Sequence, residues 1–419
     1  LVDGFDPAKA AFDDLNTQTL HATGGSVKLK WGFKGFNLHS ITAIETVQPF
    51  SRADIDGGYI YHNPVYGDGA SAPYPGGQGH ATWRMATSDA LDGHRQLSQE
   101  LRLATNNEGM FNFMIGGFYE WRRFIFDTAQ NAVNISLIRP DPITGYTWDY
   151  DKNHTTKTEA TSVFGSVILD LTDQLELSGG VRYTNENKTQ RITVPYVHRL
   201  LGPGPAFIGS GFVSPNINFK DDNLSPEVTL KYQVTPDINV FASYKTGFKS
   251  GGVDNSALPS NSLSQAALTG NFNSLIYKSE DAKGGEIGIK SQFADRSITL
   301  NATAFYYKFS DLQVQVFNAV AVQFVTSNAG EVTTKGADVG WAWRTPVEGL
   351  RFSGTLSYLD AYFSADYITF KGVNLNGRKA DARRIVHRLE HVADQGFEPL
   401  VHGLDRFRFQ PQKRIGKDD

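Results

Sequence analysis

A short run near the end of the sequence has the residue types and spacing of a zinc-dependent protease. His387, Glu390 and His391 read H-x-x-E-H. On a helix this pattern puts both histidines on one face toward Zn²⁺, with the glutamate as general base. A third ligand would have to come from a substantial downstream domain, and the run lies in a segment of unusual composition. We therefore predict that this motif does no zinc chemistry.

Other residues that could do chemistry have simpler interpretations. Asp54 and Asp56 in "RADIDGG" could bind Ca²⁺ in a loop, but a solvated turn explains them as well. The histidines at 62, 80 and 94 are scattered over one long Gly-rich region. The Gly-rich loops match neither a P-loop nor a dinucleotide-binding turn. We predict no catalytic, cofactor-binding or metal-binding residue and no cofactor, and hence not an enzyme.

Composition excludes several classes of protein. The 419 residues carry a net charge of −4, which argues against nucleic acid as a partner, and no Cys, which excludes disulfides and thiolate metal sites. Aromatic residues make up 12% of the chain, Gly occurs 41 times, and the mean hydropathy is −0.34. No run of about 20 apolar residues exists, so a transmembrane helix is not expected. Strands of a membrane barrel would escape this criterion, because they alternate.

The stretch 163–183 shows how such candidate residues would be positioned. Apolar residues alternate with polar ones on both sides of the short polar run 172–174. Because successive side chains of a strand point to opposite faces, this pattern predicts a hairpin with one apolar and one polar face. A soluble sandwich and a membrane barrel both fit a single hairpin of this kind.

The same hairpin recurs along the chain, and the connections alternate in length. Further strands are expected at 27–31, 36–47, 97–105, 111–124, 224–234, 238–248, 287–293, 298–306, 337–341 and 350–358. Short turns are expected at 172–174, 235–237, 294–296 and 344–349, and longer loops at 48–94, 124–158, 185–222 and 250–278. Short turns at one end and long loops at the other are typical of an up-and-down outer-membrane barrel. A Greek-key sandwich has no reason to sort its loops in this way.

In such a barrel, the apolar face of the sheet contacts lipid and the polar face contacts water. We predict that the apolar row faces hydrocarbon, namely Leu169, Leu177, Val181, Leu230, Val240, Ile289, Leu300 and Leu356. The opposite row should form the solvated wall of a polar lumen, namely Glu176, Arg182, Glu227, Lys231, Lys245, Glu286 and Lys290. Aromatic residues near strand ends, such as Tyr183 and Tyr244, are expected to form interfacial girdles.

Several segments resemble a known family. They are "SQELRLAT" (98–105), "LTDQLELSGGVRYTNENK" (171–188), "NLSPEVTLKYQVTPDINVFASYKTGFKSGG" (223–252), "GGEIGIKSQFADRSITLNATAFYYKFSDLQV" (284–314), "NAGEVTTKGADVGWAW" (328–343) and "PVEGLRFSGTLSYLDAYF" (346–363). In this order and spacing they resemble the β-barrel of TonB-dependent outer-membrane receptors over about residues 25–381. The resemblance implies an all-β, antiparallel up-and-down transmembrane barrel of 22 strands, occluded by an N-terminal plug, in the outer membrane of a Gram-negative bacterium.

The same resemblance implies a function and partners. Such receptors take up scarce ligands, such as ferric siderophores, cobalamin or glycans, with energy supplied through the TonB complex. Outer-membrane lipid and a small-molecule ligand are the partners expected here, and nucleic acid is not. Two alternatives stay open: a passive porin-like barrel, and a non-functional receptor fragment.

Departures from the family pattern predict three segments. Residues 1–24 are expected to be an incoming loop, 25–381 a partial barrel of about twelve to fourteen strands, and 382–419 an off-pattern tail. A plug, a TonB box and final strands are not recognisable in the sequence, so we interpret it as part of a longer protein. The tail has no Ser, Thr, Asn, Tyr or Trp. A shifted reading frame near Ala382 would produce such a change, whereas a charged helical tail is the alternative. Either way, we predict no membrane strand beyond 381.

Overall fold

The backbone of this protein, in a computed structural model, is dominated by one antiparallel sheet. The structure describes residues 17–54, 87–105, 109–130, 143–144, 149–199, 201–204, 207–254, 259, 261–318, 323–369, 372–380 and 385–393. Of residues 53–54, 87–92, 130, 317–318, 323–324 and 385–393 only the backbone is described.

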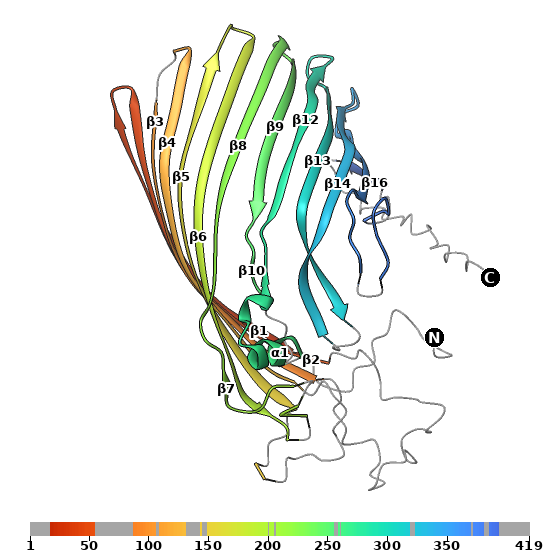
Figure 1. The fold of residues 1–419 in the computed structure, drawn as a ribbon. Coiled ribbons are helices and arrows are strands. Elements are labelled where there is room, and N and C mark those ends of the chain that lie inside the picture. Colours follow the sequence, from red (N-terminus) through yellow and green to blue (C-terminus); the bar gives the residue numbers. More distant parts are fainter. Residues whose placement is uncertain are drawn as a thin grey trace, which may run out of the picture.

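The sheet has 14 strands, and its long strands are paired in the order in which they occur in the sequence. They are β1 (Thr17–Phe33), β2 (Phe36–Asp54), β3 (Thr87–Thr105), β4 (Phe111–Gln130), β5 (Tyr150–Asp170), β6 (Leu175–Val197), β8 (Ile217–Thr235), β9 (Ile238–Lys249), β12 (Glu280–Phe293), β13 (Ile298–Asn318), β14 (Gln323–Arg344), β15 (Leu350–Phe363) and β16 (Ile385–Ala393). The short strand β7 (Phe212–Val213) pairs with β6. This is the predicted up-and-down architecture. Between the described strands β1 and β16 there is no pairing, so the sheet is an open trough (Figure 1).

The four predicted short turns lie together at one end of the sheet. Because every long strand pairs antiparallel with the next, alternate connections must share an end. Hydrogen bonds link neighbouring turns there: the Gln233 amide donates to the carbonyl of Gln174, and the Gln292 amide to that of Asp237. The Arg344 amide donates likewise to Ser297. The prediction that these four turns share one end is confirmed, and Figure 1 shows them at the end of the sheet opposite to the helix α1 (Asn261–Thr269).

The pairing register also sorts the side chains as predicted. Directly opposed residues share a face, and the pairs Leu169 with Leu177, Leu177 with Leu230, and Leu230 with Ala242 carry one row across four strands. Following the pairs through β12–β15 puts all eight predicted apolar residues on this face. The seven predicted wall residues lie on the opposite face.

Several strands are much longer than predicted. β4 continues to Gln130 and β6 to Val197, and β8 begins at Ile217, so segments expected to be loops between 124 and 158 and between 185 and 222 are partly strand. The prediction ended each strand where alternation ended. Backbone pairing needs no apolar face, because a strand that leaves hydrocarbon still satisfies its N–H and C=O groups on its neighbour.

Two segment boundaries also differ from the prediction. Strand β1 starts at Thr17, inside the segment 1–24 expected to be a loop, because β2 offers it a continuous partner from Phe33↔Phe36 to Thr17↔Arg52. The prediction that the tail beyond 381 adds no membrane strand and is helical or disordered is wrong for β16, which extends the barrel sheet by pairing with β15 from Tyr358↔Ile385 to Leu350↔Ala393. The exposed edge of β15 supplies unpaired backbone groups that any following segment can use.

A small insert between β9 and β12 packs on the polar face of the sheet. It contains β10 (Gly252–Val253), the helix α1 (Asn261–Thr269), the 3₁₀ helix η3 (Phe272–Leu275) and β11 (Ile276–Tyr277), with β10 and β11 paired. Leu263 and Ala266 of α1 are buried with Ile192, Val194 and Ile217 of the wall. Figure 1 shows α1 on the inner side of the curved sheet, so the polar face is the concave one. In the part of the chain that is described, no helix is long and apolar enough to span a membrane.

Candidate functional site

Several charges along the concave face are paired with one another. Lys231, for example, lies 3.5 Å from Glu176. Lys245 lies 3.9 Å from Glu286, which also accepts a 2.6 Å hydrogen bond from a tyrosine hydroxyl. Such partly exposed pairs contribute about 0–1 kcal/mol each. They agree with the predicted solvated wall and do not by themselves form a site.

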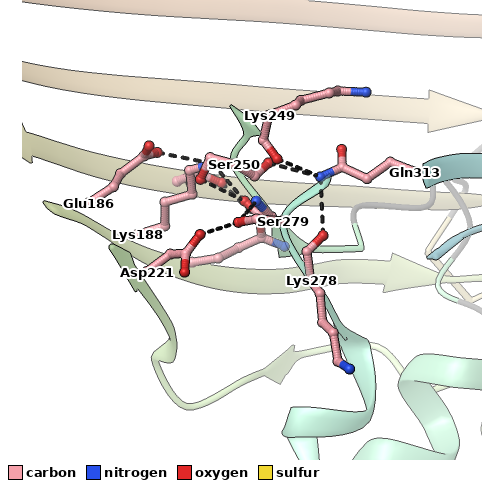
Figure 2. A network of polar contacts seen from close by, with 11 residues as sticks. Glu186, Lys188, Asp221, Lys249, Ser250, Lys278, Ser279 and Gln313 are labelled. Atoms are coloured by element: carbon pink, nitrogen blue, oxygen red, sulfur yellow. Dashed lines mark hydrogen bonds and ion pairs between the residues drawn. The ribbon is translucent and has the colours of Figure 1, made fainter. Parts of the chain in front are cut away.

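The insert is held on this wall by Lys188 of β6. Its ammonium donates to the Ser250 hydroxyl at 2.9 Å and to the Gly251 carbonyl at 2.6 Å, and pairs with Glu186 at 3.1 Å. An ammonium has three N–H donors, so these contacts use all of them. Figure 2 shows this network, in which the Ser279 hydroxyl also donates to Asp221 of β8. Lys188 is therefore a structural cation that fixes the base of the insert.

The other side of the base is held by β13 and β14. The side-chain amide of Gln313 lies 3.1 Å from each of the carbonyl oxygens of Lys249, Ser250 and Lys278, as Figure 2 shows in part. From β14, the Asn328 side chain accepts from the Lys278 amide at 2.8 Å and donates to its carbonyl at 3.0 Å. Both ends of the insert are thus tied to the wall through their backbone, which fixes the position of β10 and β11.

A cavity of about 320 Å³ lies between the insert and the wall. Two adjacent rows of paired residues from β3 to β6 form one side: His94, Phe124, Thr156 and Gln190, and then Gln96, Arg122, Thr158 and Lys188. Gly252, Val253 and Tyr277 of the insert form the other side. The cavity is therefore a pocket of the concave face, on the half of the sheet that leads to the long connections.

Two side chains of this pocket retain hydrogen-bonding capacity. The guanidinium of Arg122 makes no hydrogen bond or ion pair with any other residue that the structure describes. Gln190 is only 3% exposed; its Oε1 accepts from the Thr156 hydroxyl at 2.9 Å, whereas its Nε2 is buried without a partner in the described part of the chain. An acceptor with negative charge is the group that would satisfy both.

The insert contributes a neutral hydroxyl to the same pocket. Burial, and to a smaller extent the carboxylate of Asp254, raises the pKa of Tyr277 above its usual value of 10.0. The phenol therefore stays protonated throughout the physiological range and can donate or accept a hydrogen bond. The pocket thus combines donors with the rings of Phe124 and Tyr277, a lining that suits an aromatic or oxygen-rich small molecule.

Most residues first considered for chemistry are not drawn together. Asp56, His62 and His80 lie outside the described residues, as do the side chains of Asp54, His387 and His391. His94 is described, and it lines the pocket, where its Nε2 lies 3.9 Å from Glu45. Among the described residues, no three His, Asp or Glu side chains gather as a metal site would require.

Sequence reasoning missed Arg122, Gln190 and Tyr277. A signal did exist for the first two, because both lie at the polar positions of alternating strands. The hairpin β5–β6 has a short turn, so counting back from it pairs Thr156 with Gln190. The connection from β4 to β5 is long, so the register that brings Arg122 to the same wall could not be counted from the sequence.

Comparison with known proteins gives a consistent result. The family profile described as "TonB dependent receptor-like, beta-barrel" matches residues 3–391. The pesticin receptor of Yersinia enterocolitica is 24% identical over 246 residues, which cover 59% of this chain and 31% of that protein. The chain thus spans about a third of the length of this curated relative.

Solved structures show the same fold. The ferric yersiniabactin uptake receptor FyuA from Yersinia pestis superposes with a TM-score of 0.61 at 16% identity, covering 88% of this chain and 46% of that one. The ferric-catecholate import receptor Fiu from E. coli K12 gives a TM-score of 0.55 at 15% identity, covering 87% and 50%. At these identities the likeness concerns the fold of the barrel.

Proposed function

Since the chain belongs to the TonB-dependent receptor β-barrel family of the Gram-negative outer membrane, we propose that it serves in active uptake of a scarce metal chelate of the siderophore class. The observation that carries the proposal is the pocket on the concave face, where Arg122 and Gln190 keep unused donors beside aromatic rings. Proteins of this family are receptors and transporters rather than enzymes.

The relatives support this class of ligand. Two proteins of similar structure are an uptake receptor for ferric yersiniabactin and an import receptor for ferric catecholates. Such ligands are oxygen-rich metal chelates, often aromatic. The lining of the pocket has the donors and rings that such molecules require. In this proposal the TonB complex supplies the energy and outer-membrane lipid surrounds the apolar face.

Uptake in whole cells tests the proposal. The gene would be expressed in a bacterium without its own ferric-chelate receptors, and cell-associated radioactive iron would be measured with a panel of ferric chelates. We expect accumulation of at least one chelate, and its loss when the proton-motive force is collapsed or TonB is deleted. Iron accumulation that persists without TonB would instead establish the porin-like alternative, and absence of any binding or uptake the non-functional one.

A further inference from the structure

The pocket contains one cation, Arg122, that forms no ion pair or hydrogen bond with another described residue, unlike the cations near it. Lys188 uses its donors on Glu186 and on the base of the insert, and His94 lies near Glu45. Farther along the wall, Arg182 donates to the Ser162 hydroxyl at 2.9 Å and lies over two phenylalanine rings. Arg122 has no such carboxylate, hydroxyl or ring as a partner among the described residues, although it is half-buried.

An arginine in this position is a strong anchor for an oxygen anion. Its planar guanidinium offers five donors in a fixed geometry that matches a carboxylate or a similar oxyanion. The ammonium of Lys188 lies near it and adds positive potential, because the two groups interact electrostatically. A half-buried guanidinium beside a second cation is costly to leave without a counter-charge. The site is therefore favourable for an anion from outside the described chain.

Gln190 adds a second donor whose orientation is fixed. The Thr156 hydroxyl occupies its Oε1, so that Nε2 is the atom without a partner. A buried donor left unpaired costs about 1–3 kcal/mol. The cavity adjoins this side chain, and an acceptor atom of a ligand there would remove the cost. Thr156 thus acts as a positioning residue for the amide.

The spacing of the two donors defines what can use both. Arg122 and Gln190 lie on β4 and β6, two strands apart and on neighbouring rows, so their backbones are roughly 10–12 Å apart. Both side chains line the same cavity. We propose that Arg122 and Gln190 form a two-point anchor for the oxyanion groups of a metal chelate, so that they determine its preference for anionic over neutral chelates. This inference rests on the proposed function and adds the residues that set its specificity.

Two substitutions test the anchor. Arg122→Gln deletes a guanidinium that has no described partner. Gln190→Glu keeps an acceptor for the Thr156 hydroxyl but replaces the donor by an anion. Gln174→Glu is the matched control for the latter: Gln174 lies in the β5–β6 turn at the far end of the sheet, and its Oε1 also accepts from a hydroxyl, that of Tyr232 at 3.3 Å. Arg296→Gln, in an exposed turn at that end, is the matched control for Arg122→Gln.

The experiment measures equilibrium binding to the protein purified from outer membranes. The probes are ferric citrate, whose free carboxylates make it anionic, and a ferric trihydroxamate chelate without net charge. We expect the unsubstituted protein to prefer the anionic probe. Each anchor substitution should reduce that preference by about tenfold to a hundredfold, the range for loss of a hydrogen bond to a charged group. The two control variants should retain it.

Different outcomes separate this inference from the function on which it rests. If the anchor variants bind both probes as the controls do, the two-point anchor is wrong while the receptor function stands. A preference of the unsubstituted protein for the neutral probe would overturn the anchor in the same way. If the unsubstituted protein binds no member of a wide chelate panel, the proposed function itself fails.

Discussion

Gly251 lies where the insert meets the wall, and Gly251→Ala should loosen the insert without weakening the barrel. A Cβ at this position would clash with the carbonyl oxygen of Tyr277 and would lie 2.7 Å from the carbonyl carbon of Lys278 and 2.7 Å from Cζ of Phe219. Two of these atoms belong to the backbone of Tyr277 and Lys278 at the other end of the insert, so no side-chain rotation relieves the contact. The two ends of the insert would have to separate.

The expected cost follows from two contributions. Overpacking of this kind typically costs about 1–3 kcal/mol. Separation of the strands would also weaken the hydrogen bond from Lys188 to the Gly251 carbonyl, and a bond to a charged group contributes about 1.5–3 kcal/mol. Because the hydrogen bond is weakened rather than lost, the two contributions together predict a loss of roughly 2–5 kcal/mol of local stability. Because the insert is outside the main sheet, the stability of the barrel strands should change little.

Hydrogen exchange measures this local loss directly. Amide protection in β10, α1 and β11 should fall by about 30-fold to several-thousand-fold, since each 1.4 kcal/mol corresponds to a factor of about ten. Protection in β8 and β9 should be unchanged. Gly247→Ala in β9 is the matched control, because nothing lies within 4 Å of a Cβ built there. Equal effects of the two substitutions, or equal loss in the insert and the barrel strands, would refute this account of the insert.

Three further predictions concern the faces, the insert and the tail. Leu177→Arg should reduce the free energy of barrel folding into lipid vesicles by about 2–4 kcal/mol if the residue lies near the bilayer midplane, and Glu176→Ala by far less; equal losses in a denaturant titration would contradict the assigned faces. Because the pKa of Tyr277 is raised on folding, its contribution to stability is complete below pH 10 and is lost as the pH rises through the folded-state value. Exchange of the insert should therefore accelerate above pH 10, and less so in Tyr277→Phe; identical alkaline profiles would argue against burial of the phenol. Resequencing the codons near Ala382 should reveal a shifted frame whose alternative translation restores alternating strands, whereas a verified frame through this point would exclude it.

Local signals in the sequence were sufficient for the faces and the short turns. The turn 172–174 interrupts the alternation for so few residues that the two strands can pair in one register only, and Leu169↔Leu177 follows from it. A slip by one residue would turn Leu177 to the polar face and Glu176 to lipid. The hydrophobic pattern therefore determines both the pairing and the solvent of each face.

The ends of the strands and the pocket could not be predicted for a different reason. Beyond the membrane neither face meets hydrocarbon, so a regular apolar row no longer marks a strand; in the second half of β6 the apolar residues Ile192 and Val194 instead lie on the inner face and pack against the insert. The pocket also needs β10 and β11, which have two residues each. Strands this short show no alternating pattern, so the Gly-rich sequence around them does not predict them. Lys188 was visible as a charge at a polar position, but its role depends on the carbonyl of Gly251, 63 residues away.

The distribution of charge on the concave face bears on the choice between a specific receptor and a passive pore. A pore selects by the field of many weakly compensated charges along its wall. Here Glu176 and Glu286 each have a lysine within 4 Å, so the wall is close to neutral where these pairs lie. The uncompensated Arg122 lies instead in a pocket bounded by an insert that is tied down at both ends. A wall whose charges are compensated at these two pairs and that is cationic in one enclosed place would retain an anionic ligand rather than conduct it. Release from such a site then requires work on the protein, which is what coupling to an energy source would provide.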